Sequence, residues 1–334
     1  MTSYATQARS AGGCLSGPGV AGQEGWAAPD ARRKLQLLLA GIWLLDAVLQ
    51  FQAFMFGKGF AQMLAGTAPG NPAVIAGPIG WSARLIAQHG VVTNALFATV
   101  QLLIALGIAF RPTVRLALGL SIAWSLAVWW LGEGLGGVLS GAGSPVNGAP
   151  GAVIIYALLA VLLWPPRRER PASFVAGRST GPAVARALWL VLWGSLAYLA
   201  LQPATTARGA ISGMISGMAG GEPGWLAGID RHLAAFLATH GGAAAVVLAV
   251  VLAIVAVGVY LPRPAVRAVL VVAIVTAAVI WLAEGLGGLL TGGGTDPNSG
   301  PLLALLALAY WPLAGWPLAA APPAAVPPAQ PEPA

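Results

Sequence analysis

WLGEGLGG (residues 130–137) recurs as WLAEGLGG (residues 281–288), at an offset of 151 residues. The tripeptides QHG (88–90) and THG (239–241) repeat at the same offset. Self-similarity at one fixed spacing is the signature of a duplicated structural unit. The sequence therefore predicts two similar halves, each carrying one copy of the Glu-Gly-Leu-Gly-Gly element.

The composition around these elements is that of a membrane protein. Of the 334 residues, 57% are hydrophobic and only 8% are charged, whereas a soluble domain carries about 25% charged residues. This excludes an ordinary soluble enzyme and a disordered chain. The net charge of +7 shows no basic cluster interleaved with aromatic residues, which argues against nucleic-acid binding. Cys14 is the single cysteine, so no intrachain disulfide forms.

Eight apolar segments approach the length of about 20 residues that a membrane helix needs. Their runs are continuous and do not alternate, which favours helices over a β-barrel. We therefore expect an all-α polytopic membrane protein with about eight transmembrane helices, arranged as two parallel four-helix repeats. The expected spans are 35–55, 91–110, 116–138, 150–165, 185–203, 241–261, 267–289 and 301–318.

The segments outside the spans complete the domain organisation. We expect a disordered cytoplasmic leader and a tail rich in proline and alanine, neither of which carries chemistry. Between the first and second spans of each half, 56–88 and 206–239 are too polar and too broken by Gly and Pro to cross, and 83–87 and 233–238 look like short interfacial helices. The expected divisions are 1–34 (leader), 35–165 (first membrane unit), 166–184 (basic linker), 185–318 (second membrane unit) and 319–334 (tail).

The basic residues predict the orientation. With the N-terminus inside, 13 of the 17 Lys and Arg residues fall on the cytoplasmic side of the expected spans. Because cytoplasmic loops carry an excess of Lys and Arg, both termini are expected in the cytoplasm of a bacterial-type inner (plasma) membrane. The expected partners are the lipid bilayer, together with membrane subunits or a second copy of the chain.

Ionisable residues in the spans are the first functional candidates, because charge is costly within a bilayer. His89 precedes Arg111 by 22 residues and Glu133 follows Arg115 by 18. These spacings place both side chains near the outer face, roughly 33 and 27 Å from the inner ends of their helices. His240 and Glu284 repeat the arrangement. Each His–Glu pair would relay protons, bind a metal or hydrogen-bond a ligand, or would only fix helix packing.

A further carboxylate breaks the symmetry of the repeat. Asp46 lies 12 residues beyond Lys34, or roughly 18 Å into the membrane, and Ala197 occupies the matching position. Gln50 shares its helix face, so Asp46 and Gln50 form a deeper candidate site. Turn residues in the two matching outer loops are candidates for lining the outer mouth of a site, although turn chemistry alone accounts for them. These are Asn147, Asp296 and Asn298.

The glycines beside the two glutamates allow two interpretations. Spacings such as Gly132-x-x-x-Gly136 and Gly288-x-x-x-Gly292 are typical of small-residue faces at which membrane helices approach closely, and we favour this interpretation. Alternatively, the helix breaks after Glu133 and Glu284 and exposes backbone carbonyls to a ligand.

Each half resembles the DoxX-like family of four-span membrane proteins. The resemblance is carried by FGKGF (56–60) after the first span and by LGIAFRPT (106–113) between the second and third. The tandem doubling and the Glu-Gly-Leu-Gly-Gly element depart from the family pattern. The resemblance implies thiosulfate:quinone oxidoreduction or a role in a redox-linked membrane complex.

Three functional hypotheses follow. The chain binds or translocates a small solute, ion or proton through its outer His/Glu sites; or it is a quinone- or metal-linked redox subunit; or it is an assembly subunit without catalysis. No cofactor and no catalytic residue is identified by the sequence.

Overall fold

The computed structural model describes residues 30–314, and all regular secondary structure within that range is helical. We refer to residues 31–162 as the first half and to residues 182–310 as the second half. The first half contains α1 (Ala31–Leu49), α2 (Ala53–Phe56), α3 (Lys58–Ala65), α4 (Ala73–Ala109), η1 (Arg111–Thr113), α5 (Val114–Leu131), η2 (Gly134–Gly137), η3 (Pro145–Asn147) and α6 (Ala152–Leu162). After α7 (Val175–Thr180), the second half contains α8 (Pro182–Ala200), α9 (Pro203–Thr206), α10 (Ala210–Met218), η4 (Ala219–Gly221), α11 (Gly224–Gly258), α12 (Arg263–Ala283), η5 (Gly285–Gly288) and α13 (Ser299–Tyr310).

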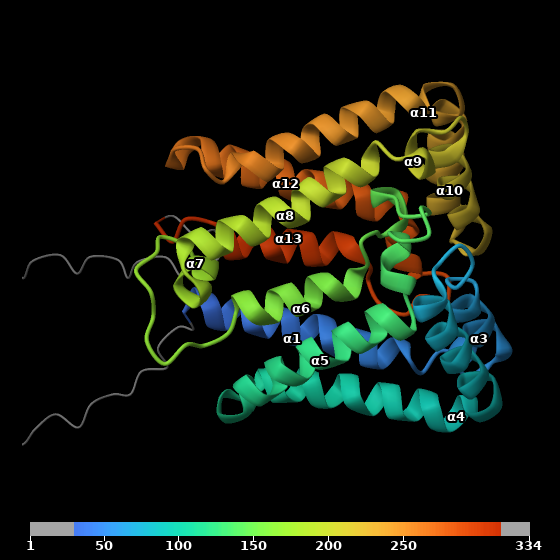
Figure 1. The fold of residues 1–334 in the computed structure, drawn as a ribbon, viewed down its shortest axis with the longest axis horizontal. Coiled ribbons are helices and arrows are strands. Elements are labelled where there is room, and N and C mark those ends of the chain that lie inside the picture. Colours follow the sequence, from blue (N-terminus) through green and yellow to red (C-terminus); the bar gives the residue numbers. More distant parts are fainter. Residues whose placement is uncertain (1–29, 315–334) are drawn as a thin grey trace, which may run out of the picture.

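Two short apolar helices, α6 and α13, occupy the middle of the bundle and pack against each other (Figure 1). No residue of either helix is exposed. Helix α5 covers α6, helix α12 covers α13, and α1 also contacts α13. The long helices α4 and α11 lie further out, against α1 and α8 respectively. One hydrophobic core runs through both halves as a result.

Five segments of the described chain are long and apolar enough to cross a membrane, which is compatible with an integral membrane protein. They are α4, the stretch 111–131, α8, α11 and the stretch 264–283. The expectation of eight such spans is met only in part. Helices α6 and α13 have 11 and 12 residues, which amounts to about 17 and 18 Å at 1.5 Å per residue. Helix α1 has 19 residues but carries four charged side chains.

The bundle has two chemically different ends. At the end that carries α7, which we call the basic end, arginine side chains donate hydrogen bonds to backbone carbonyls. Arg33 donates to the carbonyl oxygens of Ile108, at 2.8 Å, and Ala109, and so caps the last turn of α4. Cations are stabilised near helix C-termini, where carbonyl groups lack partners. The opposite end carries α3, α10, η2 and η5 (Figure 1). We call it the chamber end, because the two cavities described in the next subsection lie toward it.

The segments expected to lie at the outer interface are more helical than predicted. Residues 83–87 belong to the 37-residue helix α4, and residues 233–238 belong to the 35-residue helix α11. Within α4 the backbone departs from helical geometry at His89, with φ −130° and ψ 38°. Two helical parts therefore meet at a kink at His89, and residues 83–87 belong to the part that precedes the kink.

The favoured interpretation of the repeated glycines is wrong, because the helices break beside the glutamates. Helix α5 ends at Leu131, and Leu135 and Gly136 then adopt φ of +55° and +64°. The second half does the same after Ala283. A Cβ at Gly136 would lie 2.2 Å from the carbonyl carbon of Pro150. These glycines therefore permit a left-handed turn and a close backbone approach, and they do not form a helix-packing face.

The expected linker is partly built into the core. Phe174 stacks on Tyr310 with ring centroids 5.4 Å apart, and Leu313 donates its backbone N–H to the Ser173 carbonyl at 2.8 Å. Of the expected leader, Ala31 to Lys34 form the first turn of α1, and residues up to 29 lie outside the described range. The expected tail 319–334 also lies outside the described residues.

The close approach at Gly136 generates a stability prediction. We expect Gly136→Ala to lower the free energy of unfolding by about 1–2 kcal/mol for the left-handed backbone and by about 1–3 kcal/mol more for the steric overlap. Gly141→Ala is the matched control, because Gly141 has φ +74° and open space around its Cβ position. Thermal unfolding in detergent measures both variants. Equal midpoints would show that the Pro150 contact does not constrain the fold.

Candidate functional site

Two adjoining cavities lie in the first half toward the chamber end. The inner chamber, of about 440 Å³, is enclosed by α1, α3, α4, α5 and α6. The outer chamber, of about 340 Å³, lies among η2, η3 and the loop before α13. Four residues line both cavities: Thr67, Glu133, Thr295 and Asp296. Because Pro69, Ala142 and Asn147 at the outer chamber are exposed, the outer chamber opens at the protein surface.

The polar wall of the inner chamber centres on Asp46, one of the candidate residues named from the sequence. Tyr156 from α6 donates its hydroxyl proton to Asp46 Oδ2 at 2.6 Å. Asp46 is 2% exposed, and its Oδ1 has no hydrogen-bond partner. Gln50 lies one turn further along the same face, and its Oε1 is also buried without a partner. The predicted pair Asp46 and Gln50 does line one cavity.

The remaining wall of the inner chamber is largely aromatic. Trp43 packs against Tyr156 with ring centroids 4.4 Å apart, and Phe97 meets the edge of Trp124 at 5.5 Å. The indole of Trp43 donates to Ser121 Oγ at 3.1 Å, which fixes the orientation of its ring. Trp81 also lines the chamber, and its 55% exposure gives the chamber a side that reaches the protein surface.

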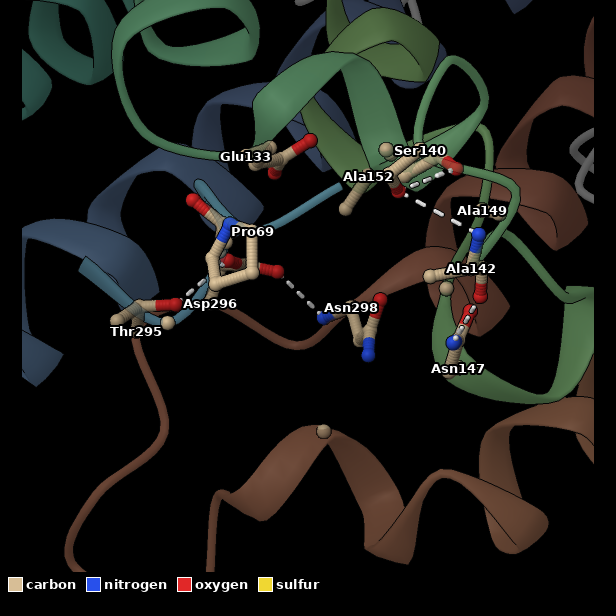
Figure 2. Close-up of a pocket in the computed structure, with 17 residues that line it drawn as sticks. Pro69, Glu133, Ser140, Ala142, Asn147, Ala149, Ala152, Thr295, Asp296 and Asn298 are labelled. Atoms are coloured by element: carbon tan, nitrogen blue, oxygen red, sulfur yellow. Dashed lines mark hydrogen bonds between the residues drawn. The ribbon is translucent and has the colours of Figure 1, made fainter. Parts of the chain in front are cut away.

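Glu133 and Asp296 line both chambers and so lie where the chambers meet. Figure 2 shows the two side chains at the outer chamber. The helix break after α5 places Glu133 there. Gly151 makes room for its carboxylate, because a Cβ at Gly151 would lie 2.2 Å from Glu133 Oε2. That oxygen is buried without a hydrogen-bond partner. Asp296 accepts hydrogen bonds from Thr295 Oγ1 at 2.9 Å and from the Asn298 backbone N–H at 2.7 Å. Burial raises the pKa of Asp296 above its ordinary value.

Asn147 and Asn298 each stabilise a turn and also line the outer chamber. Asn147 Oδ1 accepts from the Ser144 backbone N–H at 2.9 Å, and Asn298 Oδ1 accepts from the Ser299 backbone N–H at 2.8 Å. These bonds stabilise the turns before α6 and α13. Both residues also line the outer chamber, at the position predicted for a mouth (Figure 2).

The two halves exchange loops at the chamber end. The loop before α13 brings Asp296 into the chambers of the first half, and Gln52 anchors this loop by donating to the Gly294 carbonyl at 2.9 Å. Conversely, η3 brings Val146 into a hydrophobic cluster of the second half, beside Ile211 and Ile215. The loop from the second half is acidic and borders a cavity, whereas the loop from the first half is apolar and packs into the second half.

The second half lacks the polar wall of the inner chamber. At the offset of 151 residues, Asp46, Gln50 and Tyr156 correspond to Ala197, Leu201 and Ala307. Glu284, the counterpart of Glu133, accepts a hydrogen bond from Ser299 Oγ at 2.7 Å and lines neither chamber.

The histidines do not join the glutamates. His89 is exposed and lines neither chamber. His240 is exposed, stacks on Phe236 with ring centroids 4.4 Å apart, and shares its Nδ1 with Thr239 Oγ1 and the Phe236 carbonyl. No His–Glu hydrogen bond forms within residues 30–314, so the structure does not bring together the pairs that the sequence suggested.

Sequence reasoning missed Tyr156 and Gln101, which both line the inner chamber. Each is a polar side chain within an expected span. The matching residues of the second half, Ala307 and Leu252, are apolar. The same difference between the halves that drew attention to Asp46 could therefore have identified Tyr156 and Gln101. In the described part of the chain, no group of three or more His, Cys, Asp or Glu side chains is placed to hold a metal ion.

Comparison with known proteins adds no assignment. No protein-family model, no curated protein and no solved structure matches the chain.

The bond between Tyr156 and Asp46 generates a second prediction. Tyr156→Phe removes the only hydrogen bond that the Asp46 carboxyl group receives within residues 30–314. We therefore expect the free energy of unfolding to fall by about 1–3 kcal/mol. Tyr198→Phe is the control, because Tyr198 is 63% exposed and its substitution should change stability by less than about 0.5 kcal/mol. Chemical or thermal unfolding of both variants provides the measurement. An equal effect would mean that the buried bond contributes no net stability.

Proposed function

We propose that the chain is an integral membrane protein that binds a small solute in the inner chamber of its first half, reached through the outer chamber. The observation that carries this proposal is a cavity of about 440 Å³ bordered by buried carboxylate and amide oxygens without partners. Leaving such a group unpaired costs about 1–3 kcal/mol, more if it is charged. A bound ligand supplies the missing partners.

The proposed arrangement has eight membrane segments in two parallel units. Its support is the correspondence of element bounds: α1 and α8 begin at 31 and 182, and η2 and η5 begin at 134 and 285. Both pairs differ by the same 151 residues as the sequence repeat. The short helices α6 and α13 need not span the full hydrocarbon thickness in contact with lipid, because other helices surround them. The second half then acts mainly as a scaffold that contributes Asp296.

The distribution of charge supports an orientation. Twelve Lys and Arg residues between positions 32 and 267 lie at helix ends or in loops of the basic end, whereas Lys58, Arg84, Arg208 and Arg231 lie toward the chamber end. By the positive-inside rule, the basic end faces the cytoplasm of a plasma membrane and the chambers open outward. The described termini, near residues 30 and 314, then lie on the cytoplasmic side.

The chambers favour binding from the outside over an open channel. Toward the basic end, fully buried apolar side chains follow the inner chamber on the helices that line it, including Leu39 on α1, Ile108 on α4 and Leu159 on α6. These residues close the path below Asp46. Passage across the membrane would require these helices to move apart, as in alternating access.

A redox role is the second candidate. Its support is the aromatic wall, where Trp43 and Trp124 offer flat surfaces to a ring such as that of a quinone. An assembly role is less favoured, since polar groups that only join helices would be paired within the chain, whereas Asp46 Oδ1 is not.

Thiol accessibility tests the proposed chamber. In a Cys14→Ser chain, Ala127→Cys places a thiol on the inner chamber wall, and we expect a membrane-impermeant thiosulfonate added outside intact cells to modify it. Ala123→Cys, one turn earlier on α5, is exposed but lines neither chamber. In lipid its thiol stays protonated and should not react.

In a parallel experiment on the unsubstituted chain, the native Cys14 reports on orientation. We expect it to be protected in intact cells and labelled once the membrane is opened. Equal labelling of Ala127→Cys and Ala123→Cys, or protection of both, would contradict a water-filled outward chamber. Turnover of a soluble quinone analogue by the purified chain would support the redox candidate instead.

A further inference from the structure

We infer that the ligand of the inner chamber is an organic ammonium ion with a flat apolar body, of the arylalkylamine class. This inference rests on the proposed function, because it names the ligand class of the same site. It is carried by three features of the chamber: the kind of polar atom left unpaired, the sign of the charges, and the aromatic wall.

The fully buried side-chain atoms of the chamber that have no hydrogen-bond partner are all acceptors. They are Asp46 Oδ1, Gln50 Oε1, Gln101 Oε1 and Glu133 Oε2. A ligand that completes these groups must donate hydrogen bonds. An ammonium group carries up to three N–H donors and no acceptor. It therefore matches this wall, whereas a quinone, which presents carbonyl acceptors, leaves the same oxygens unpaired.

The charges of the two chambers have one sign. Asp46, Glu133 and Asp296 line them, and no Lys or Arg among the described residues does. The two ion pairs in the described part of the chain join Glu169 to Arg32 and to Arg178, at the basic end. A carboxylate in low dielectric without a counter-charge must be protonated or meet a cation. A cationic ligand resolves this imbalance, and an anionic one worsens it.

The aromatic wall adds affinity and a shape requirement. Trp43, Trp81, Trp124 and Phe97 surround the polar wall, and indole faces attract cations within about 6 Å. A cavity of about 440 Å³ lies within the range of small-molecule pockets, about 300–1,000 Å³. It has room for an aromatic ring beside the ammonium group. A bare inorganic cation would satisfy the carboxylates but leave this apolar space unfilled.

The second half contributes the outermost charge of the site. Asp296 is supplied by the loop before α13 and lines both chambers, so a ligand entering from the outer chamber passes it on the way to Asp46. We therefore assign Asp296 to the capture of the cation and Asp46 to its final position.

Calorimetry on the purified full chain in lipid nanodiscs tests the ligand class. The probes are phenethylammonium, the nearly isosteric neutral 2-phenylethanol, and the anion phenylacetate. We expect phenethylammonium to bind at one site at least about tenfold more tightly than 2-phenylethanol, with no measurable binding of phenylacetate. Bound phenethylammonium should also protect Ala127→Cys from thiol modification.

Variants locate the cation within the chamber. Asp46→Asn should weaken phenethylammonium binding at least about tenfold, and Asp296→Asn should weaken it to a smaller extent. Glu222→Gln is the control. Glu222 is a half-buried acid of the second half whose carboxylate oxygens are buried without partners, and it lines neither chamber. The affinity of this variant for phenethylammonium should stay within about twofold of that of the unmodified chain. If Asp46→Asn fails to fold, the test rests on Asp296→Asn, because Asp296 lies in a loop and its substitution should leave the fold intact.

Two outcomes overturn the inference: equal affinity for the neutral and cationic probes, or unchanged affinity in both Asp46→Asn and Asp296→Asn. Either result, combined with outside labelling of Ala127→Cys, removes the ammonium assignment and leaves the proposed chamber intact. Failure of the labelling itself removes the proposed function instead.

Discussion

Asp46 sits in an apolar bundle with one hydrogen bond, from Tyr156, and with a second oxygen that faces a cavity unpaired. A carboxylate in such surroundings is tolerated only where a proton, a cation or donor groups compensate it. The helices and side chains around Asp46 meet this need for compensation in part. Helices α1 and α6 hold the two partners together, and aromatic side chains keep space open beside them. No Lys or Arg between residues 30 and 314 lines the chamber, so in the proposed function a ligand supplies the compensation.

The glycine segment after α5 determines how the chamber is reached. If α5 continued as a helix through residue 138, the direction of the Glu133 side chain would be set by the face of that helix. Instead, the left-handed turn at Leu135 and Gly136 ends the helix and lets the chain pass close to Pro150. Glu133 then faces both chambers, and space remains for the loop of the second half that carries Asp296. One site is thereby completed by both halves of the chain.

The sequence predicted the class of the fold and part of the site for physical reasons that hold locally. Scarce charge indicates a membrane setting, and a helix period of 3.6 places Asp46 and Gln50 on one face. The depth calculation for His89 and Glu133 failed as a guide to contact, because depth along a helix says nothing of the direction in which a side chain points. Asp296 reaches its position through a loop exchange between halves 151 residues apart, which no local pattern encodes. The glycines were misjudged because a small-residue spacing suits both a packed helix and a broken one.

The most direct test of the chamber as a cation site is anomalous scattering from crystals of the full chain soaked with 4-bromophenethylammonium. The account predicts a bromine peak within the inner chamber, between Trp43 and Trp124, with density for the ammonium group against Asp46. A peak only at the lipid-facing surface, or the same peak with 2-(4-bromophenyl)ethanol and no dependence on Asp46, would contradict it.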